Sequence, residues 1–143
     1  MNKLFKKVFA GILSGTLLAG TLLAIGLTGS KEAVPAHAAL QTVNFVAGTD
    51  TSSTTSITKT PITVSVTSGT LSRTDNYRCY ANNTMTISTS VGTLSSIVFT
   101  FSGSYNGGWS TSYTGLSDNS WTSASASGQA RITQIVVTYN DGG

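Results

Sequence analysis

Apolar and polar residues alternate with a period of two along most of the chain after residue 38. In five segments apolar side chains occupy every second position, mostly with Thr or Ser between them: residues 43–45, 62–66, 85–87, 97–101 and 135–139. Successive side chains of a β-strand point to opposite faces, so this pattern is typical of strands with one buried face and one face in water. After residue 38 no segment combines a helical period with helix-forming residues. The pattern therefore predicts an all-β domain.

Turn-forming sequences separate these segments. They are Ser68-Gly69, Asn82-Asn83, Val91-Gly92, residues 106–108 and Asp118-Asn119. Gly, Asn and Asp adopt the backbone conformations of tight turns at little cost. Short strands at this spacing predict a single antiparallel β-sandwich, jelly-roll-like in type, over residues 39–143. Residues 49–56 are mostly Ser and Thr and have little to bury, so we expect a flexible connection between the first two strands.

One pattern occurs twice. Residues 94–101 (LSSIVFTF) and residues 132–139 (ITQIVVTY) both read as apolar, two polar, Ile-Val, apolar, Thr, aromatic. Such β-branched and aromatic residues favour strands. We predict two central strands, one in each half of the domain, each closing the core with its last aromatic ring.

The first 38 residues have a different composition. A cationic start with three lysines precedes an apolar run over residues 8–27, and Ala36-His37-Ala38 gives the small-x-small pattern that signal peptidase reads. We predict that residues 1–38 are a signal peptide whose removal leaves residues 39–143 outside the cell or at its surface, with no membrane attachment. The alternative is an uncleaved membrane anchor, because the apolar run is about long enough to span a bilayer.

Charge is balanced in the predicted mature domain. The whole chain has a formal net charge of +3, but four of its five lysines precede residue 39. Residues 39–143 carry four acids and four bases: Asp50, Asp75, Asp118 and Asp141 against Lys59, Arg73, Arg78 and Arg131. Nucleic-acid binding needs a basic face, so we expect no nucleic-acid partner. Solubility rests instead on neutral hydroxyl groups, because 40 of these 105 residues are Ser or Thr.

Few residues of the domain are suited to catalysis. Residues 39–143 contain no His and no Glu, and Cys79 is their one cysteine. A cysteine nucleophile needs a base, and zinc needs several His or Cys ligands, so we expect no enzyme activity, no metal site and no cofactor. Asp75-Asn76 and Asp118-Asn119 favour turns over a surface calcium site, which needs closer oxygen ligands. Cys79 is predicted to be a small buried side chain, and the alternative is a reactive thiol or an intermolecular bridge.

Aromatic residues gather around one glycine-rich loop. Trp109 lies in this loop, with Tyr105, Asn106 and Tyr113 close to it in sequence. An exposed Trp beside Tyr offers flat apolar faces that stack on sugar rings, and Asn106 or Asn82 would supply hydrogen bonds. Trp109, Tyr105, Tyr113 and Asn106 are therefore the candidate ligand-binding residues. The alternative is that Trp109 folds back over one open end of the sandwich and enlarges a small core.

The order of these motifs resembles a known kind of module. The motifs are residues 43–45, 62–64, 77–80, 82–87 and 94–101, then Trp121 and residues 131–139. From about Thr42 to Tyr139 they resemble the small β-sandwich accessory modules of secreted and surface proteins of bacteria, whose function is generally unassigned. The resemblance implies the fold and a place for Trp121 in the core or at its rim, and it implies no functional residue. Cys79 departs from the pattern, since these modules tend to have an ordinary apolar residue there.

Two functions from different classes fit these observations. The first is a secreted, non-catalytic binding module for neutral carbohydrate or a cell-envelope polymer, which predicts an exposed Trp109. The second is a structural or self-associating extracellular or matrix protein, because Thr-rich edge strands with little charge are poorly protected against pairing with another copy. A weaker third interpretation is a small secreted factor resembling a bacteriocin.

Overall fold

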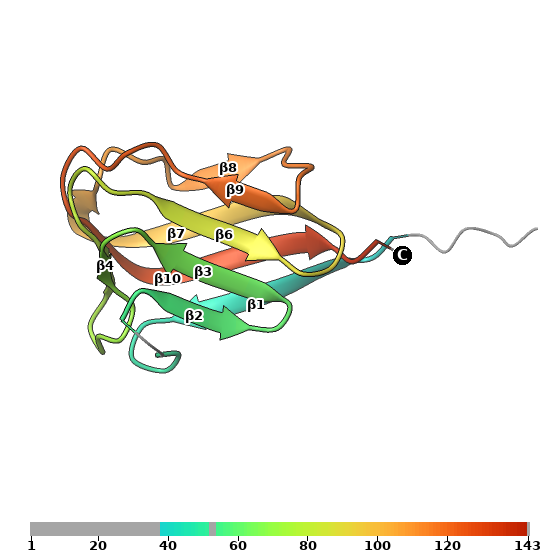
Figure 1. Cartoon of the computed structure of the whole chain (residues 1–143), viewed down its shortest axis with the longest axis horizontal. Helices are drawn as coiled ribbons and strands as arrows, with labels where there is room; N and C mark the ends of the chain where they lie inside the picture. Colours follow the sequence, from blue (N-terminus) through green and yellow to red (C-terminus); the bar gives the residue numbers. More distant parts are fainter. Residues whose placement is uncertain (1–37, 52–53, 143) are drawn as a thin grey trace, which may run out of the picture. The chain divides into compact units, whose positions relative to one another are not determined.

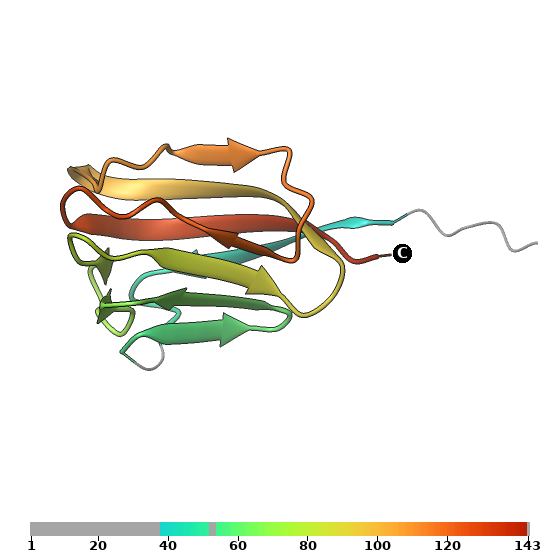
Figure 2. The same ribbon diagram turned by 45° about the horizontal axis from the view of Figure 1, so that its top comes forward.

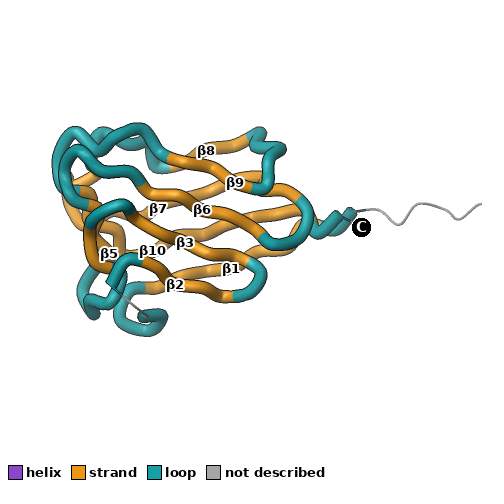
Figure 3. The backbone as a smooth tube through the Cα atoms, in the orientation of Figure 1, coloured by secondary structure: helices purple, strands orange, loops and turns teal. Residues whose placement is uncertain are grey.

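The computed structural model of the chain describes residues 38–51 and 54–142. In these residues ten β-strands form two antiparallel sheets, and there is no helix (Figure 1 and Figure 3). The predicted all-β class is therefore confirmed. No helix of this part of the chain is long and apolar enough to cross a membrane. The predicted signal peptide lies outside the described residues except for Ala38.

The larger sheet has the strand order β4-β5-β10-β7-β8, and β1 also pairs with β10. Its strands are β1 (Leu40–Val46), β4 (Gly69–Thr70), β5 (Tyr77–Cys79), β7 (Thr93–Asn106), β8 (Ser112–Thr114) and β10 (Ala130–Asn140). Figure 2 shows the long strands β7 and β10, gold and red, side by side at the centre of this sheet. On its other edge β10 pairs with β5 through residues 130–132 and with β1 through residues 134–140.

The smaller sheet has the order β2-β3-β6-β9. Its strands are β2 (Ser56–Lys59), β3 (Ile62–Val66), β6 (Met85–Thr89) and β9 (Ser120–Thr122). The five segments with period-two alternation correspond to β1, β3, β6, β7 and β10. The alternation did not predict β2, β4, β5, β8 and β9, which are two to four residues long. The turn predicted at Ser68-Gly69 is wrong in part, since Gly69 belongs to strand β4 and pairs with Cys79 of β5.

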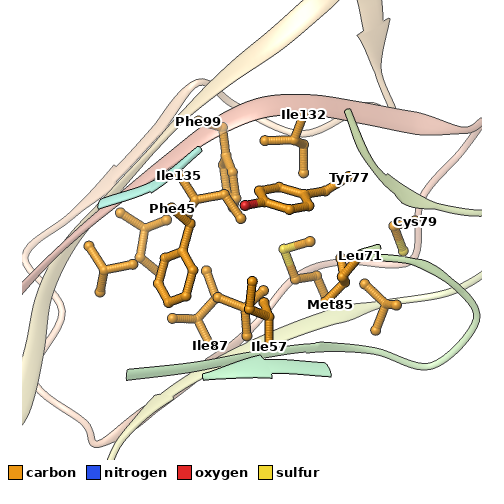
Figure 4. Packing of buried hydrophobic residues seen from close by; sticks show 14 of the residues in the cluster. Phe45, Ile57, Leu71, Tyr77, Cys79, Met85, Ile87, Phe99, Ile132 and Ile135 are labelled. Carbon is orange, nitrogen blue, oxygen red and sulfur yellow. The ribbon is translucent and has the colours of Figure 1, made fainter. Parts of the chain in front are cut away.

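One hydrophobic core lies between the sheets. In Figure 1, strands β9, β6, β3 and β2 overlie β8, β7, β10 and β1, and Figure 4 shows side chains of both sheets meeting in the space between them. Phe45 and Ile135 come from the larger sheet, Met85 and Ile87 come from the smaller one, and all four are fully buried. Burying such a side chain is worth about 1.5–3 kcal/mol relative to leaving it exposed. The core therefore holds the two sheets face to face.

The repeated sequence pattern occupies β7 and β10. Both strands are central, as predicted, but they pair directly with each other in one sheet instead of lying in separate halves of the domain. Because the pair is antiparallel, Leu94 lies opposite Tyr139 and Phe101 lies opposite Ile132. The two terminal rings therefore close opposite ends of the pair, where Tyr139 is buried and Phe101 packs half-buried against the core.

Asp50, in the connection between β1 and β2, joins three strands. Its carboxylate accepts a hydrogen bond from the Val46 N–H at 2.9 Å and forms an ion pair with Lys59 at 3.0 Å. Its carbonyl oxygen accepts a hydrogen bond of 2.6 Å from the Tyr77 hydroxyl. Burial raises the pKa of this carboxyl, but the Val46 N–H and Lys59 outweigh burial and hold the pKa below its ordinary value. The connection that we predicted to be flexible, residues 49–56, therefore contains near its start a residue fixed by β1, β2 and β5.

Candidate functional site

Trp109 does not offer an exposed ring. Its side chain is 4% exposed, and the indole Nε1 donates a hydrogen bond of 2.9 Å to the Ala124 carbonyl. Its ring centroid lies 6.0 Å from that of Phe99. The prediction that Trp109 is an exposed binding residue is therefore wrong, and the alternative that it folds back onto the core agrees with the structure. A small domain gains more from burying such a large ring than from leaving it in water.

Tyr113 belongs to a packing cluster of aromatic rings. Its ring centroid lies 4.6 Å from that of Trp121 and 6.2 Å from that of Phe99, the latter in an edge-on arrangement. Its hydroxyl oxygen accepts a hydrogen bond of 3.0 Å from the Ser110 N–H. Trp121 is half-buried against the core, at the rim position that we expected. These rings join β8 of one sheet to β9 of the other, so Tyr113 has a structural role in this cluster.

Tyr105 and Asn106 line an open hollow where β7 ends and β10 begins. The hollow has a volume of about 390 Å³, and its wall is formed by residues 104–108, residues 127–129 and Arg131. The Gly108 N–H donates a hydrogen bond of 2.8 Å to the Asn106 Oδ1, which fixes the turn that lines the hollow. Of the four candidate residues, the structure brings these two together at one surface.

The Tyr105 ring is held in place while remaining accessible. It is 48% exposed, and the guanidinium carbon of Arg131 lies 4.0 Å from the ring centroid. Arg131 Nε also donates a hydrogen bond of 2.6 Å to the Gln129 Oε1. A guanidinium stacked on an aromatic face attracts it electrostatically and limits its motion. Sequence reasoning missed Arg131 and Gln129, which lie more than twenty residues from Tyr105 and come to the same hollow through the pairing of Ala130 with Asn106.

Cys79 and Asp75 have environments typical of structural groups. Cys79 is fully buried, as predicted, and burial raises the pKa of its thiol to about 11. The Arg73 guanidinium, 2.8 Å from Asp75, holds the pKa of that carboxyl at about 2. At neutral pH the thiol is therefore protonated and the carboxyl is ionised. Among the described residues, no three His, Cys, Asp or Glu side chains lie close enough to hold a metal ion.

Comparisons with known proteins leave the geometry as the basis for function. No protein-family model, curated protein or solved structure matches the chain.

Proposed function

We propose that the chain is a non-catalytic binding module for neutral carbohydrate or a cell-envelope polymer, and that the hollow beside Tyr105 is its sugar site. The observation that carries this proposal is an aromatic ring, half exposed and braced by a guanidinium, at the edge of an open hollow. Sugar rings have apolar C–H faces, and a Tyr ring offers a flat apolar surface against which such a face can pack.

Polar groups surround the ring in the way that a sugar ligand needs. Gln129 and Arg131 supply side-chain polar groups, and the glycine turn that lines the hollow supplies backbone groups. The Asn106 Oδ1 already accepts a hydrogen bond within the turn, so the amide N–H groups of this side chain are the ones that would donate hydrogen bonds to a ligand. A few such groups around one apolar surface fix the orientation of a ligand without any catalytic residue.

We also propose a type for the fold and a location for the domain. The two facing sheets would form a jelly-roll-like β-sandwich resembling the accessory modules of bacterial secreted proteins. Removal of residues 1–38 would place the domain outside the cell or at its surface. There a neutral polymer is within reach of a domain that carries no net charge.

Affinity electrophoresis tests this function. The purified protein and its Tyr105→Ala variant would be run through gels containing soluble neutral polysaccharides, with Tyr80→Ala as the matched control, because Tyr80 is 40% exposed and lies outside the hollow. We expect retardation of the parent and of Tyr80→Ala, and weakening by about tenfold in Tyr105→Ala, since loss of a stacked ring removes roughly 1.4 kcal/mol. Equal retardation of all three proteins would remove Tyr105 from the site, and migration of the parent unchanged by every neutral polysaccharide would refute the proposal.

Self-association is the second candidate function. Strands β8 and β9 end their sheets, are three residues long each and carry no charged side chain (SYT and SWT). An uncharged edge has no side chain that repels a strand of another copy. Sedimentation velocity over a hundredfold range of concentration tests this candidate. Oligomers that grow with concentration and are unaffected by Tyr105→Ala would favour it, and a constant monomer would reject it.

A further inference from the structure

The outer face of the smaller sheet consists of hydroxyl-bearing side chains. In β2, β3, β6 and β9 the inward positions, apart from Lys59 and Thr89, hold residues that form the core or pack against it, and the outward positions within the paired strands are all Ser or Thr. We call these eight residues the hydroxyl face: Ser56, Thr58, Thr63, Ser65, Thr86, Ser88, Ser120 and Thr122. All eight are half-buried or exposed, and none lines the hollow beside Tyr105.

Strand pairing aligns the hydroxyl face in two rows across all four strands. The first row runs through Thr58, Thr63, Ser88 and Ser120, and the second runs through Ser56, Ser65, Thr86 and Thr122. Neighbouring strands lie about 4.8 Å apart, and side chains on one face repeat after about 6.8 Å along a strand, so each row spans roughly 14 Å. The hydroxyl groups therefore repeat regularly in two dimensions.

Contacts between side chains hold part of this array in place. The Thr58 and Thr63 hydroxyl oxygens lie 2.9 Å apart, as do those of Thr86 and Thr122. The β-branched Thr side chain has few rotamers, and a hydrogen bond across the strands restricts it further. A ligand that matches the array consequently orders few side chains when it binds.

The larger sheet lacks such a face. It has one row of Ser and Thr, but the adjacent row contains Asn44, Val136 and Val98 before Ser112. Hydroxyl groups there repeat in one direction only. The two-dimensional array is consequently a feature of the smaller sheet and does not follow from the fold alone.

The chemistry of the hydroxyl face limits the classes of ligand that it could bind. Its eight side chains include no charge that would attract an ion or a charged polymer, and no ring on which a single sugar would stack. A single hydrogen bond to a ligand hydroxyl adds little binding free energy, because it only replaces a hydrogen bond to water. Many such bonds add up on a rigid surface that presents hydroxyl groups repeatedly, because the first contact holds the remaining hydroxyl groups close to their partners.

We propose that the hydroxyl face binds the surface of an insoluble, uncharged polysaccharide. An uncharged face complements an uncharged polymer, and parallel polymer chains present hydroxyl groups in regular rows. This inference rests on the proposed function in one respect, that the ligand is a neutral glycan. It differs in the surface used, since the hollow beside Tyr105 suits a single soluble chain.

Depletion binding to microcrystalline cellulose and to chitin tests this inference. The double variant Thr63→Val, Thr86→Val removes one hydroxyl from each central strand and retains β-branched side chains that suit a strand. The matched control is Thr42→Val, Thr138→Val, a directly paired couple on the outer face of the larger sheet. We expect the partition of the hydroxyl-face variant onto the solid to fall by about fivefold or more, and that of the control to stay within twofold of the parent.

Three further outcomes overturn the inference. If both double variants are retained equally well, the hydroxyl face is excluded as the binding surface. If the parent itself is not retained on either solid, the hydroxyl face is excluded as well. Adsorption to growing ice, with no retention on any polysaccharide, would assign the array to another ligand. If the double variant fails to fold, as circular dichroism would show, the single variant Thr122→Val at the sheet edge gives the same comparison.

Soluble polysaccharide distinguishes this inference from the proposed function. Tyr105→Ala should lose binding to soluble chains and keep its retention on the solid, whereas Thr63→Val, Thr86→Val should show the reverse. If the parent binds soluble chains but is not retained on the solid, binding by the hydroxyl face is refuted and the sugar site at the hollow is still supported. A parent retained on the solid through the hydroxyl face, with no binding of soluble chains, would refute the hollow and support the hydroxyl face.

Discussion

Replacement of Trp109 by Ala should destabilise the domain strongly. Trp109 is 4% exposed, packs beside Phe99, and donates a hydrogen bond to the Ala124 carbonyl. The substitution removes a buried indole ring from the core and deletes one of the hydrogen bonds to that carbonyl, to which the Ser123 hydroxyl still donates at 2.8 Å. If Trp109 were a surface binding residue, the same substitution would leave stability almost unchanged.

The expected loss can be estimated from the burial of the ring. Truncating a buried Trp to Ala costs about 3–5 kcal/mol of unfolding free energy. A domain of this size has roughly 5–15 kcal/mol in total, so the variant should remain folded but marginal. Since 1 kcal/mol shifts the Tm of such a domain by about 4 °C or more, we expect Tm to fall by at least about 12 °C.

Urea denaturation followed by far-UV circular dichroism measures this loss directly. Trp109→Phe keeps an aromatic ring beside Phe99 and deletes the indole N–H, so it should lose much less, about 1–2 kcal/mol. Tyr105→Ala is the surface control and should lose less than about 1 kcal/mol, because Tyr105 is 48% exposed. A Trp109→Ala protein no less stable than Tyr105→Ala would refute the burial of Trp109.

Three further predictions concern other positions of the domain. Cys79 should resist thiol reagents at pH 8 in the native protein and react rapidly in urea. Because burial raises the pKa of its thiol from 9.0 to about 11, the thiol of the unfolded chain ionises first as pH rises, so the free energy of unfolding should fall between pH 9 and 11, and urea midpoints would show this. Gly92→Ala should lower Tm markedly, because Gly92 has φ +60° and an added Cβ would overlap the Asn140 carbonyl, whereas Gly115→Ala, with open space, should cost about 1 kcal/mol from its positive φ alone. Ser123→Ala should cost about 1–3 kcal/mol in a urea titration, because the buried Met85 N–H loses its 2.9 Å acceptor; a loss under 0.5 kcal/mol would mean that another acceptor replaces it.

The long strands were predictable from the sequence, and the short ones were not. Alternation places Ile97 and Phe99 on one face of β7 whatever their neighbours are, because the period of a strand is fixed by its backbone. The strand β4 has no period to detect, and Gly69 lies where an added Cβ would overlap the Arg78 carbonyl. A glycine needed for such a close approach cannot be distinguished in sequence from a glycine needed for a turn.

The candidate site was predictable only in part. The sequence placed Tyr105 and Asn106 beside a glycine-rich loop, and in the structure both line a hollow there. The burial of Trp109 depends on the Ala124 carbonyl and on Phe99, which only the folded chain brings to it. Likewise Arg131 reaches Tyr105 because β10 pairs with β7 in one particular register, and no local pattern determines a register between distant segments.

An NMR titration tests the central claim most directly. Amide spectra of the purified protein would be recorded with increasing amounts of soluble neutral oligosaccharides, and with an acidic oligosaccharide for comparison. We expect a neutral ligand to shift the amides of residues 104–108 and 127–131, with the same ligand leaving Tyr105→Ala unchanged. Shifts confined to another surface, shifts caused only by the acidic ligand, or no shift with any sugar would contradict a neutral sugar site at this hollow.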